Sequence, residues 1–122
     1  MAGTVTKTEI TYTSVKKIEF DWTSSSGGAA DATTTNSYTG LIQRVVQIPN
    51  LAGTQPTNLY DVVVNDSDGE DVLHGNGANL SNAASTVKDY TNGLGAVVNS
   101  TLTLAVTNAG DSKTGKTIIY LR

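Results

Sequence analysis

The sequence predicts an all-β protein, an antiparallel β-sandwich or small β-barrel with one short helix. Apolar and polar residues alternate in several short runs, and Gly, Asn and Pro separate these runs at fairly regular spacing. Only 16% of the residues are charged, and uncharged Thr, Ser, Asn and Gly, which suit sheet faces and turns, make up the difference. Such a pattern is typical of antiparallel sandwiches and barrels.

The chain is expected to form one domain over residues 1–122. A protein of this length can bury roughly two-thirds of the surface that its unfolded chain exposes. A net charge of −3 is too small for a disordered chain, and the apolar residues are concentrated in runs. Two segments are expected to extend from the core, an N-terminal arm at about 1–8 and a long polar loop at about 23–40.

The first strands are expected within residues 4–13 and 15–22. In the second run Ile18, Phe20 and Trp22 share one face and charged residues share the other, which makes it the clearest half-buried strand. Residues 23–40 carry almost nothing apolar before Tyr38, and this composition predicts a mobile loop or a contact arm.

Two β-branched runs then predict strands at residues 41–48 and 59–64, with Pro49 ending the first. Turn residues at 65–69 follow the second run, and an apolar run resumes at 71–73. Residues 59–73 are therefore expected to form a hairpin.

The predicted helix covers residues 79–90. Asn79 stands in the position of an N-cap, and four apolar residues follow at helical spacing, namely Leu80, Ala83, Ala84 and Val87. After the Gly-rich segment 93–95, the alternation of residues 97–107 predicts a strand with Leu102, Leu104 and Val106 on one face.

Residues 117–121 predict a last strand, paired with residues 97–107. The segment between them, residues 110–117, matches the phosphate-binding pattern G-x-x-x-x-G-K-[ST]. Such a loop must open a helix whose N-terminal amides hold the phosphates. Because β-branched and aromatic residues follow Thr117, we interpret the match as the loop of a hairpin.

The candidates for chemistry favour neither an enzyme nor a bound metal or other cofactor. Four carboxylates surround Gly69, namely Asp66, Asp68, Glu70 and Asp71. Calcium-loop spacing is missing, so a solvated turn is our interpretation, with an adventitious divalent cation as the alternative. An acid/base pair would require an apolar pocket to raise one pKa. His74 is the only histidine, and neither a nucleophile motif nor a second metal ligand of its kind accompanies it.

The remaining composition bears on partners and location. Eight basic residues, spread thinly, against eleven acidic ones give no footprint for nucleic acid. There is no run of about 20 apolar residues to span a membrane, and the N-terminus lacks the apolar region of a secretion signal. The protein is therefore expected to be soluble. The absence of cysteine excludes disulfides and thiolate metal sites.

Five aromatic residues offer a second type of contact, namely Trp22, Tyr12, Tyr38, Tyr60 and Tyr90. They would form a platform for a sugar or a protein if several shared one exposed face. Trp22 and Tyr60 lie in alternating strands, so we interpret them as core residues. Tyr38, in the polar loop, is the better candidate for an external contact.

Four segments resemble small virion-associated proteins of tailed bacteriophages, namely residues 4–24, 60–66, 69–73 and 93–104. The resembling segments are spread between residues 4 and 104 and consist of strand and turn patterns. It implies a capsid decoration, or cement, protein: a β-rich module, often trimeric, made in the host cytoplasm and bound to the outer surface of the virion.

The resemblance implies the major capsid protein as partner, a homo-oligomer with a trimer favoured, and stabilisation of the shell. The residues expected at the contact are Thr4, Val5 and Thr6 of the arm and Tyr38 of the loop. Two alternatives stay open. One is a carbohydrate-binding or host-adhesion module that uses Tyr38 and the 66–71 turn, and the other is a head-tail joining or tail subunit.

Overall fold

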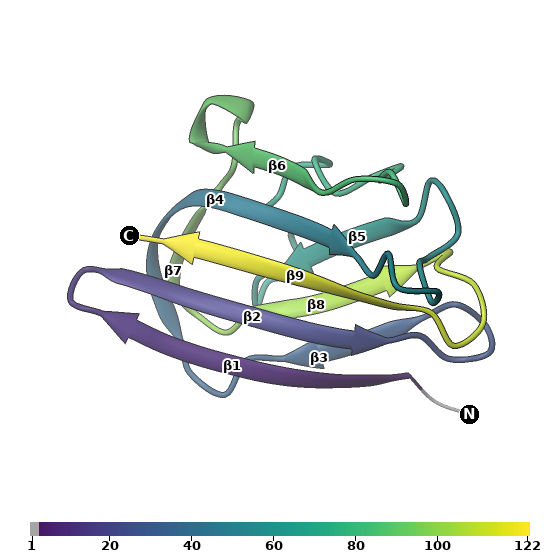
Figure 1. Cartoon of the computed structure of the whole chain (residues 1–122). Coiled ribbons are helices and arrows are strands. Elements are labelled where there is room, and N and C mark those ends of the chain that lie inside the picture. Colours follow the sequence, from purple (N-terminus) through teal and green to yellow (C-terminus); the bar gives the residue numbers. More distant parts are fainter. Residues whose placement is uncertain (1–2) are drawn as a thin grey trace.

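The computed structural model describes residues 3–122 as two antiparallel β-sheets that pack face to face (Figure 1). The elements in chain order are β1 (Thr4–Tyr12), β2 (Val15–Thr23), β3 (Ala30–Thr33), β4 (Tyr38–Pro49), β5 (Asp61–Asn65), β6 (Thr86–Asp89), the 3₁₀ turn η1 (Tyr90–Asn92), β7 (Ala96–Ser100), β8 (Thr103–Thr107) and β9 (Thr114–Leu121). The all-β prediction is confirmed. Of the two expected architectures, the described residues form the sandwich and not the closed barrel.

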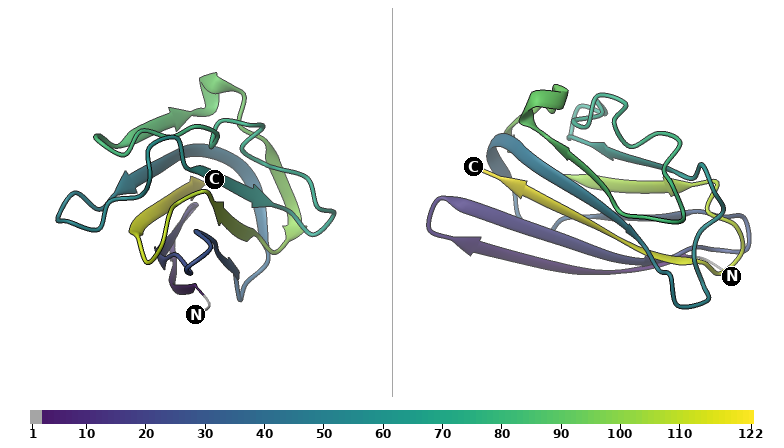
Figure 2. Two further views of the ribbon diagram at one scale, coloured as in Figure 1. Left: turned by 90° about the vertical axis from the view of Figure 1, so that its right-hand side faces the viewer. Right: turned by 45° about the horizontal axis from the view of Figure 1, so that its top comes forward.

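The two sheets differ in size. The large sheet has the order β1-β2-β9-β4-β6, with β7 paired to the start of β4, and the small sheet has the order β3-β8-β5. The register of β4 shifts between Tyr38 and Gly40 and again between Ile42 and Arg44. The strand therefore bends at its start, and Figure 2 shows the bend as an arch over one side of the sandwich.

The core lies between the inner faces of the two sheets. Alternate residues of each strand point inward, and the following ones are at most 2% exposed: Ile18, Phe20, Trp22, Val45, Val62, Val64, Leu104, Val106, Ile119 and Leu121. The predicted inner faces of β2 and of residues 102–106 are confirmed. Burial of this apolar surface is the main term that holds the sheets together.

Two aromatic rings join the sheets at one end of this core. Trp22 of β2 and Tyr60, which precedes β5, are 2% and 1% exposed. Their ring centroids lie 5.7 Å apart with the planes tilted by 52°, within the range of favourable aromatic pairs. Burial raises the pKa of Tyr60 to about 12. Both residues belong to the core, as the sequence predicted.

Both segments expected outside the core are largely built into the sheets. In place of an arm at 1–8, the structure pairs Thr4 with Thr23 and continues as β1, while residues 1–2 lie outside the described residues. The predicted loop at 23–40 contains β3 and the start of β4. Ala30 of β3 is 3% exposed because β8 and the core supply the apolar contacts that the segment itself lacks.

Residues 79–90 contain no α-helix, so that prediction was wrong. Asn79 has a φ of 53° and is no N-cap, and Leu80 forms a β-bridge with Tyr60. Thr86–Asp89 form β6, in which Val87 pairs with Val46 of β4. Pairing with the edge of the large sheet outweighs both the helical spacing of this segment and the helix preference of its two Ala residues, while its Ser and Asn residues favour turns.

The run at 97–107, expected to be one strand, is divided between two ladders. β7 pairs with β4, whereas β8 lies in the centre of the small sheet, and the linking Leu102 is fully buried. β9 pairs with β2 and β4 instead of β8, so residues 108–113 cross between the sheets rather than closing a hairpin. Both β7 and β8 carry buried residues, although these strands pair within different sheets, because both strands face the same core.

The predicted hairpin at 59–73 is present only in part. Asp66–Glu70 form its turn, with Gly69 at a φ of 87° and a backbone bond of 2.9 Å from Asp66 N–H to Glu70 C=O. After Asp71, which bridges to Asn65, the chain leaves the ladder in a series of turns. Val72 and Leu73 are buried in the core without forming a second strand.

The inner face also buries one polar pair, which yields a stability prediction. The Thr117 hydroxyl donates to Gln47 Oε1 at 2.6 Å, and both residues are almost fully buried. Gln47 Nε2 has no hydrogen-bond partner among residues 3–122. Gln47→Leu alone would leave the buried Thr117 hydroxyl without a hydrogen-bond acceptor. This change is expected to lower the free energy of unfolding by about 1–3 kcal/mol.

The double variant Gln47→Leu/Thr117→Val removes all the polar atoms of this pair and nearly conserves volume. We expect its stability to lie within about 1 kcal/mol of the wild type. Urea unfolding of the two variants measures the difference. A double variant no more stable than Gln47→Leu would contradict this account of the pair.

Candidate protein-binding surface

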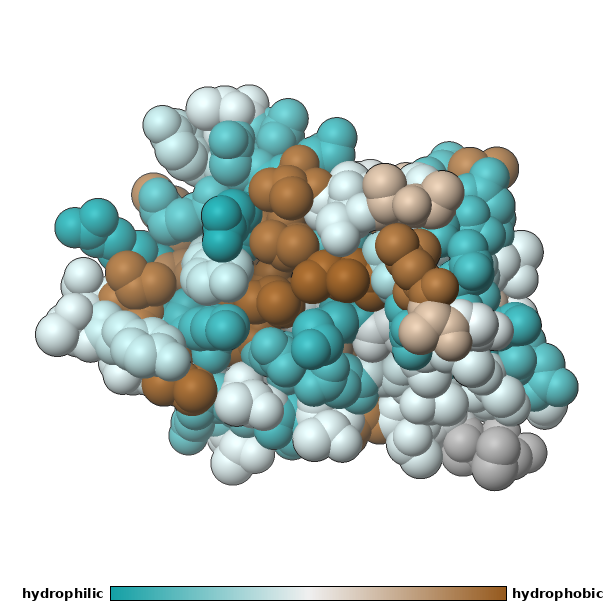
Figure 3. All heavy atoms as spheres, in the orientation of Figure 1, coloured by the Kyte–Doolittle hydropathy of each residue, from teal (hydrophilic) through white to brown (hydrophobic). Residues whose placement is uncertain are grey.

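The outer face of the large sheet, which points away from the small sheet, carries an apolar stripe. The register places Val87, Val46 and Ile118 in one row across β6, β4 and β9, and Ile48 follows on the same face. We define these four residues with Leu51 as the apolar stripe. Val87 is 54% and Leu51 59% exposed, Val46 and Ile48 are half-buried, and Ile118 is only 8% exposed. Figure 3 shows apolar atoms gathered in a band across this face.

Two pairs of adjacent apolar residues build the stripe. In Val45-Val46 and Ile118-Ile119, one residue of each pair points into the core and the other points outward. The outer face of an antiparallel sheet is commonly polar, so apolar residues on both faces make this face a candidate contact surface. The sequence analysis predicted both runs as strands without assigning their faces, although the adjacent apolar pairs interrupt the period-two pattern and could have revealed the stripe.

Charged residues cover the same face beside the stripe. Lys116 of β9 lies 3.3 Å from the Asp21 carboxylate and 3.6 Å from that of Glu19, both on β2. The hydrogen bond and charge of Asp21, with the charge of Glu19, raise the pKa of Lys116. On the other side of the Val46–Ile118 row, the Arg44 guanidinium stands 4.5 Å from the centre of the Tyr120 ring. These exposed pairs add little stability, but they fix charges next to the stripe.

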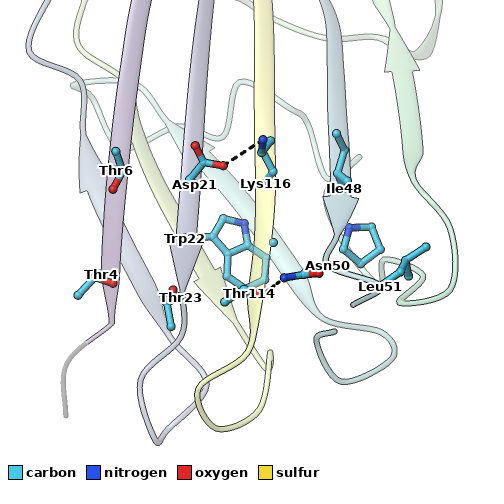
Figure 4. Close-up of a pocket in the computed structure, with 12 residues that line it drawn as sticks. Thr4, Thr6, Asp21, Trp22, Thr23, Ile48, Asn50, Leu51, Thr114 and Lys116 are labelled. Carbon is cyan, nitrogen blue, oxygen red and sulfur yellow. Dashed lines mark hydrogen bonds and ion pairs between the residues drawn. The ribbon is translucent and has the colours of Figure 1, made fainter. Parts of the chain in front are cut away.

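An open groove of about 620 Å³ continues the stripe toward the start of β9 and the end of β4 (Figure 4). Its rim includes Thr4, Thr6, the Asp21–Lys116 ion pair, Ile48 and Leu51. Asn50 Nδ2 donates to Thr114 Oγ1 at 2.8 Å across its lower end.

The missing side chain of Gly115 gives room to the Trp22 indole beneath the groove. A Cβ atom on Gly115 would lie 2.3 Å from Cζ2 of that indole. Because Trp22 is only 2% exposed, it supports the groove without offering a stacking surface.

The Glu9 carboxylate connects β1 to residues 35–38, which lead from β3 into the start of β4. Glu9 accepts hydrogen bonds from the backbone N–H groups of Thr35 at 2.9 Å and Asn36 at 3.1 Å, and from the Tyr38 hydroxyl at 2.6 Å. Partial burial raises the pKa of Glu9, but these three bonds and the nearby Lys7 charge outweigh it and hold the pKa below its ordinary value. Burial, followed by the contact with Glu9, raises the pKa of Tyr38.

The four expected contact residues do not form one site. Thr4 and Thr6 are exposed and line the groove, whereas Val5 packs against the core. Tyr38 is 6% exposed, which contradicts its expected role as an external contact. Its ring is drawn into the core at the start of β4 because its hydroxyl finds an acceptor in Glu9.

The other motifs serve local structure. In the 110–117 segment, Thr114 opens strand β9 and not a helix, so the phosphate-loop context is missing. Asp66 Oδ1 accepts the N–H groups of Asp68 and Glu70 within its turn. His74 Nδ1 lies 2.5 Å from the Gly93 carbonyl oxygen. Within residues 3–122, no three His, Cys, Asp or Glu side chains are grouped to hold a metal ion.

Among residues 3–122, no helix combines the length and the apolar character needed to cross a membrane. Comparison with protein-family models, with curated proteins and with solved structures found no match to this chain.

Proposed function

We propose that this protein is a bacteriophage capsid decoration protein that binds the major capsid protein through the apolar stripe. In this proposal it acts by surface complementarity and not by catalysis, is made in the host cytoplasm and resides on the outer surface of the virion. The observation that carries the binding role is the exposure of Val87 and Leu51 at the two ends of the apolar stripe on the outer face. The sequence resemblance carries the identity of the partner.

The energetics of the stripe support a protein partner. Fully burying one Val, Leu or Ile side chain is worth roughly 1.5–3 kcal/mol. Val87 and Leu51 are more than half exposed, so most of this free energy is still to be gained when a surface covers them. The flanking charges of Lys116 and Arg44 would orient the bound partner, because fixed charges beside an apolar patch favour one arrangement of complementary charges.

The stripe also rests on a rigid base. β4 and β9 lie in the middle of the large sheet, with ladder partners on both sides. Binding therefore requires little ordering of the backbone, which keeps the entropy cost of association low. This property suits a protein that must attach to a preformed shell.

The first test places a charge in the stripe. Val87→Lys is expected to weaken binding to isolated capsid shells roughly 10- to 100-fold, because a lysine removes apolar contact and must be desolvated. Val98→Lys is the matched control, since Val98 is 76% exposed on β7 and lies outside the stripe. It should bind as the wild type does. Co-sedimentation with shells over a titration of protein measures both affinities.

Equal binding by Val87→Lys and the wild type would contradict the stripe as the docking surface. Failure of the wild-type protein to bind shells would contradict the decoration role itself. In that case, binding on a glycan array would favour the adhesion module, and attachment to isolated tails would favour the tail subunit.

A further inference from the structure

Strand β1 forms one free edge of the large sheet. Its nine residues pair with β2 along their whole length, from Thr4 opposite Thr23 to Tyr12 opposite Val15. Among the described residues, no strand pairs with its other side. Such an edge presents a row of unpaired backbone N–H and C=O groups, which can accept a further strand.

The sequence of β1 is complementary to itself when read backwards. Its residues are TVTKTEITY, with Thr8 at the centre. In an antiparallel pair of two β1 strands centred on Thr8, Lys7 of each copy would face Glu9 of the other. On the outer face Ile10 would face Thr6, and Tyr12 would face Thr4. Opposite charges and β-branched or aromatic pairs are the combinations that stabilise cross-strand neighbours.

We propose that β1 pairs with β1 of a second copy, antiparallel and centred on Thr8, so that two large sheets join into one continuous sheet. The two copies are related by a two-fold axis perpendicular to the sheet, as closed isologous dimers require. This surface is separate from the apolar stripe.

The charges on β1 select a second copy over other strands. Charged side chains on an edge strand normally discourage pairing. Lys7 Nζ donates to the Thr33 carbonyl at 2.6 Å, and Glu9 is held by the three bonds described above, so both charges have fixed positions. An unrelated strand would meet two unmatched charges, whereas a second β1 meets an opposite charge at each of them.

The pairing has a consequence that rests on the proposed function. A two-fold axis perpendicular to the sheet leaves the outer faces of both copies on the same side. Both apolar stripes would then face one capsid surface, and a bivalent module binds more tightly than either half alone. The arrangement is a dimer, in contrast to the trimer that the resemblance implies.

The first test is the mass in solution of the wild-type protein without capsid shells. Light scattering after size exclusion is expected to give twice the chain mass of 12.7 kDa, falling to one chain mass on dilution. A monomer at every concentration or a trimer would overturn the proposal. Neither result depends on binding to a shell.

The second test determines the register with introduced cysteines, each of which is the only cysteine in its chain because the natural sequence has none. Directly opposed residues in an antiparallel pair have Cα atoms about 4.5–5.5 Å apart, within the range of a disulfide. Thr8→Cys should therefore give a disulfide-linked dimer under mild oxidation. Thr6→Cys is the matched control, because the exposed Thr6 residues of the two copies would be separated by four residues along the strand.

A mixture of Thr6→Cys and Ile10→Cys proteins completes the test, because residues 6 and 10 face each other in the proposed register. This mixture should form mixed disulfide dimers faster than either variant alone forms its own. Cross-linking of Thr6→Cys as fast as Thr8→Cys would overturn the register. A wild-type dimer whose Thr8→Cys form does not cross-link would overturn pairing through β1.

Discussion

Gly115→Ala is expected to destabilise the protein by about 3 kcal/mol, a large part of the stability of a domain of this size. The added Cβ would lie 2.3 Å from Cζ2 and 2.8 Å from Cε2 of the Trp22 indole. The ring cannot withdraw easily, because it is 2% exposed and packs against Tyr60. Urea unfolding should show a lower midpoint with an unchanged slope.

A matched control and a compensating change distinguish this clash from a general effect of losing glycine. Gly27→Ala has only Ser25 Oγ near the new Cβ, at 3.8 Å, and should change stability by less than about 0.5 kcal/mol. Adding Trp22→Leu to Gly115→Ala should cost less than the sum of the two single changes, because the shorter side chain vacates the space. Additive costs would contradict direct contact as the cause.

The sequence alone predicts those strands whose inner face can be identified without knowing which strands they pair with. In β2, Ile18, Phe20 and Trp22 alternate with charged residues, and this pattern alone identifies the inner face. Prediction from the sequence pattern failed where pairing with another strand determines the secondary structure. Val87 has helical spacing with its neighbours, but it lies in a strand because β4 offers an edge there.

The candidate surface was harder to predict for a related reason. Val46 and Ile118 look like further core residues, since hydrophobicity does not state which side of a sheet a residue faces. Only the register with Val45 and Ile119 in the core shows that they point outward. Tyr38 was misplaced because the carboxylate that draws it inward, Glu9, is 29 residues away in the sequence.

Glu9→Gln is expected to lower the free energy of unfolding by about 1–2 kcal/mol at neutral pH. The carboxylate accepts three hydrogen bonds that join β1 to the segment before β4. A glutamine offers one acceptor oxygen and turns an N–H₂ group toward the remaining donors. Glu70→Gln is the control, because that turn carboxylate is exposed and makes no side-chain hydrogen bond within residues 3–122.

The pH dependence of this variant follows from the lowered pKa of Glu9. When the folded-state pKa lies below the ordinary value of 4.5, the stabilisation is complete above 4.5 and is lost as the pH falls through the lowered pKa. The stability gap between the wild type and Glu9→Gln should therefore be widest at neutral pH and close in acid.

Hydrogen exchange gives a local readout of the same change. The Thr35 and Asn36 amides should exchange faster in Glu9→Gln, while amides in the β2–β9 ladder keep their protection. A gap that stays constant down to low pH would show that Glu9 acts through packing alone. Because the Glu9 carboxylate is also one of the charges that would face a second β1, Glu9→Gln should shift the proposed dimer toward monomer.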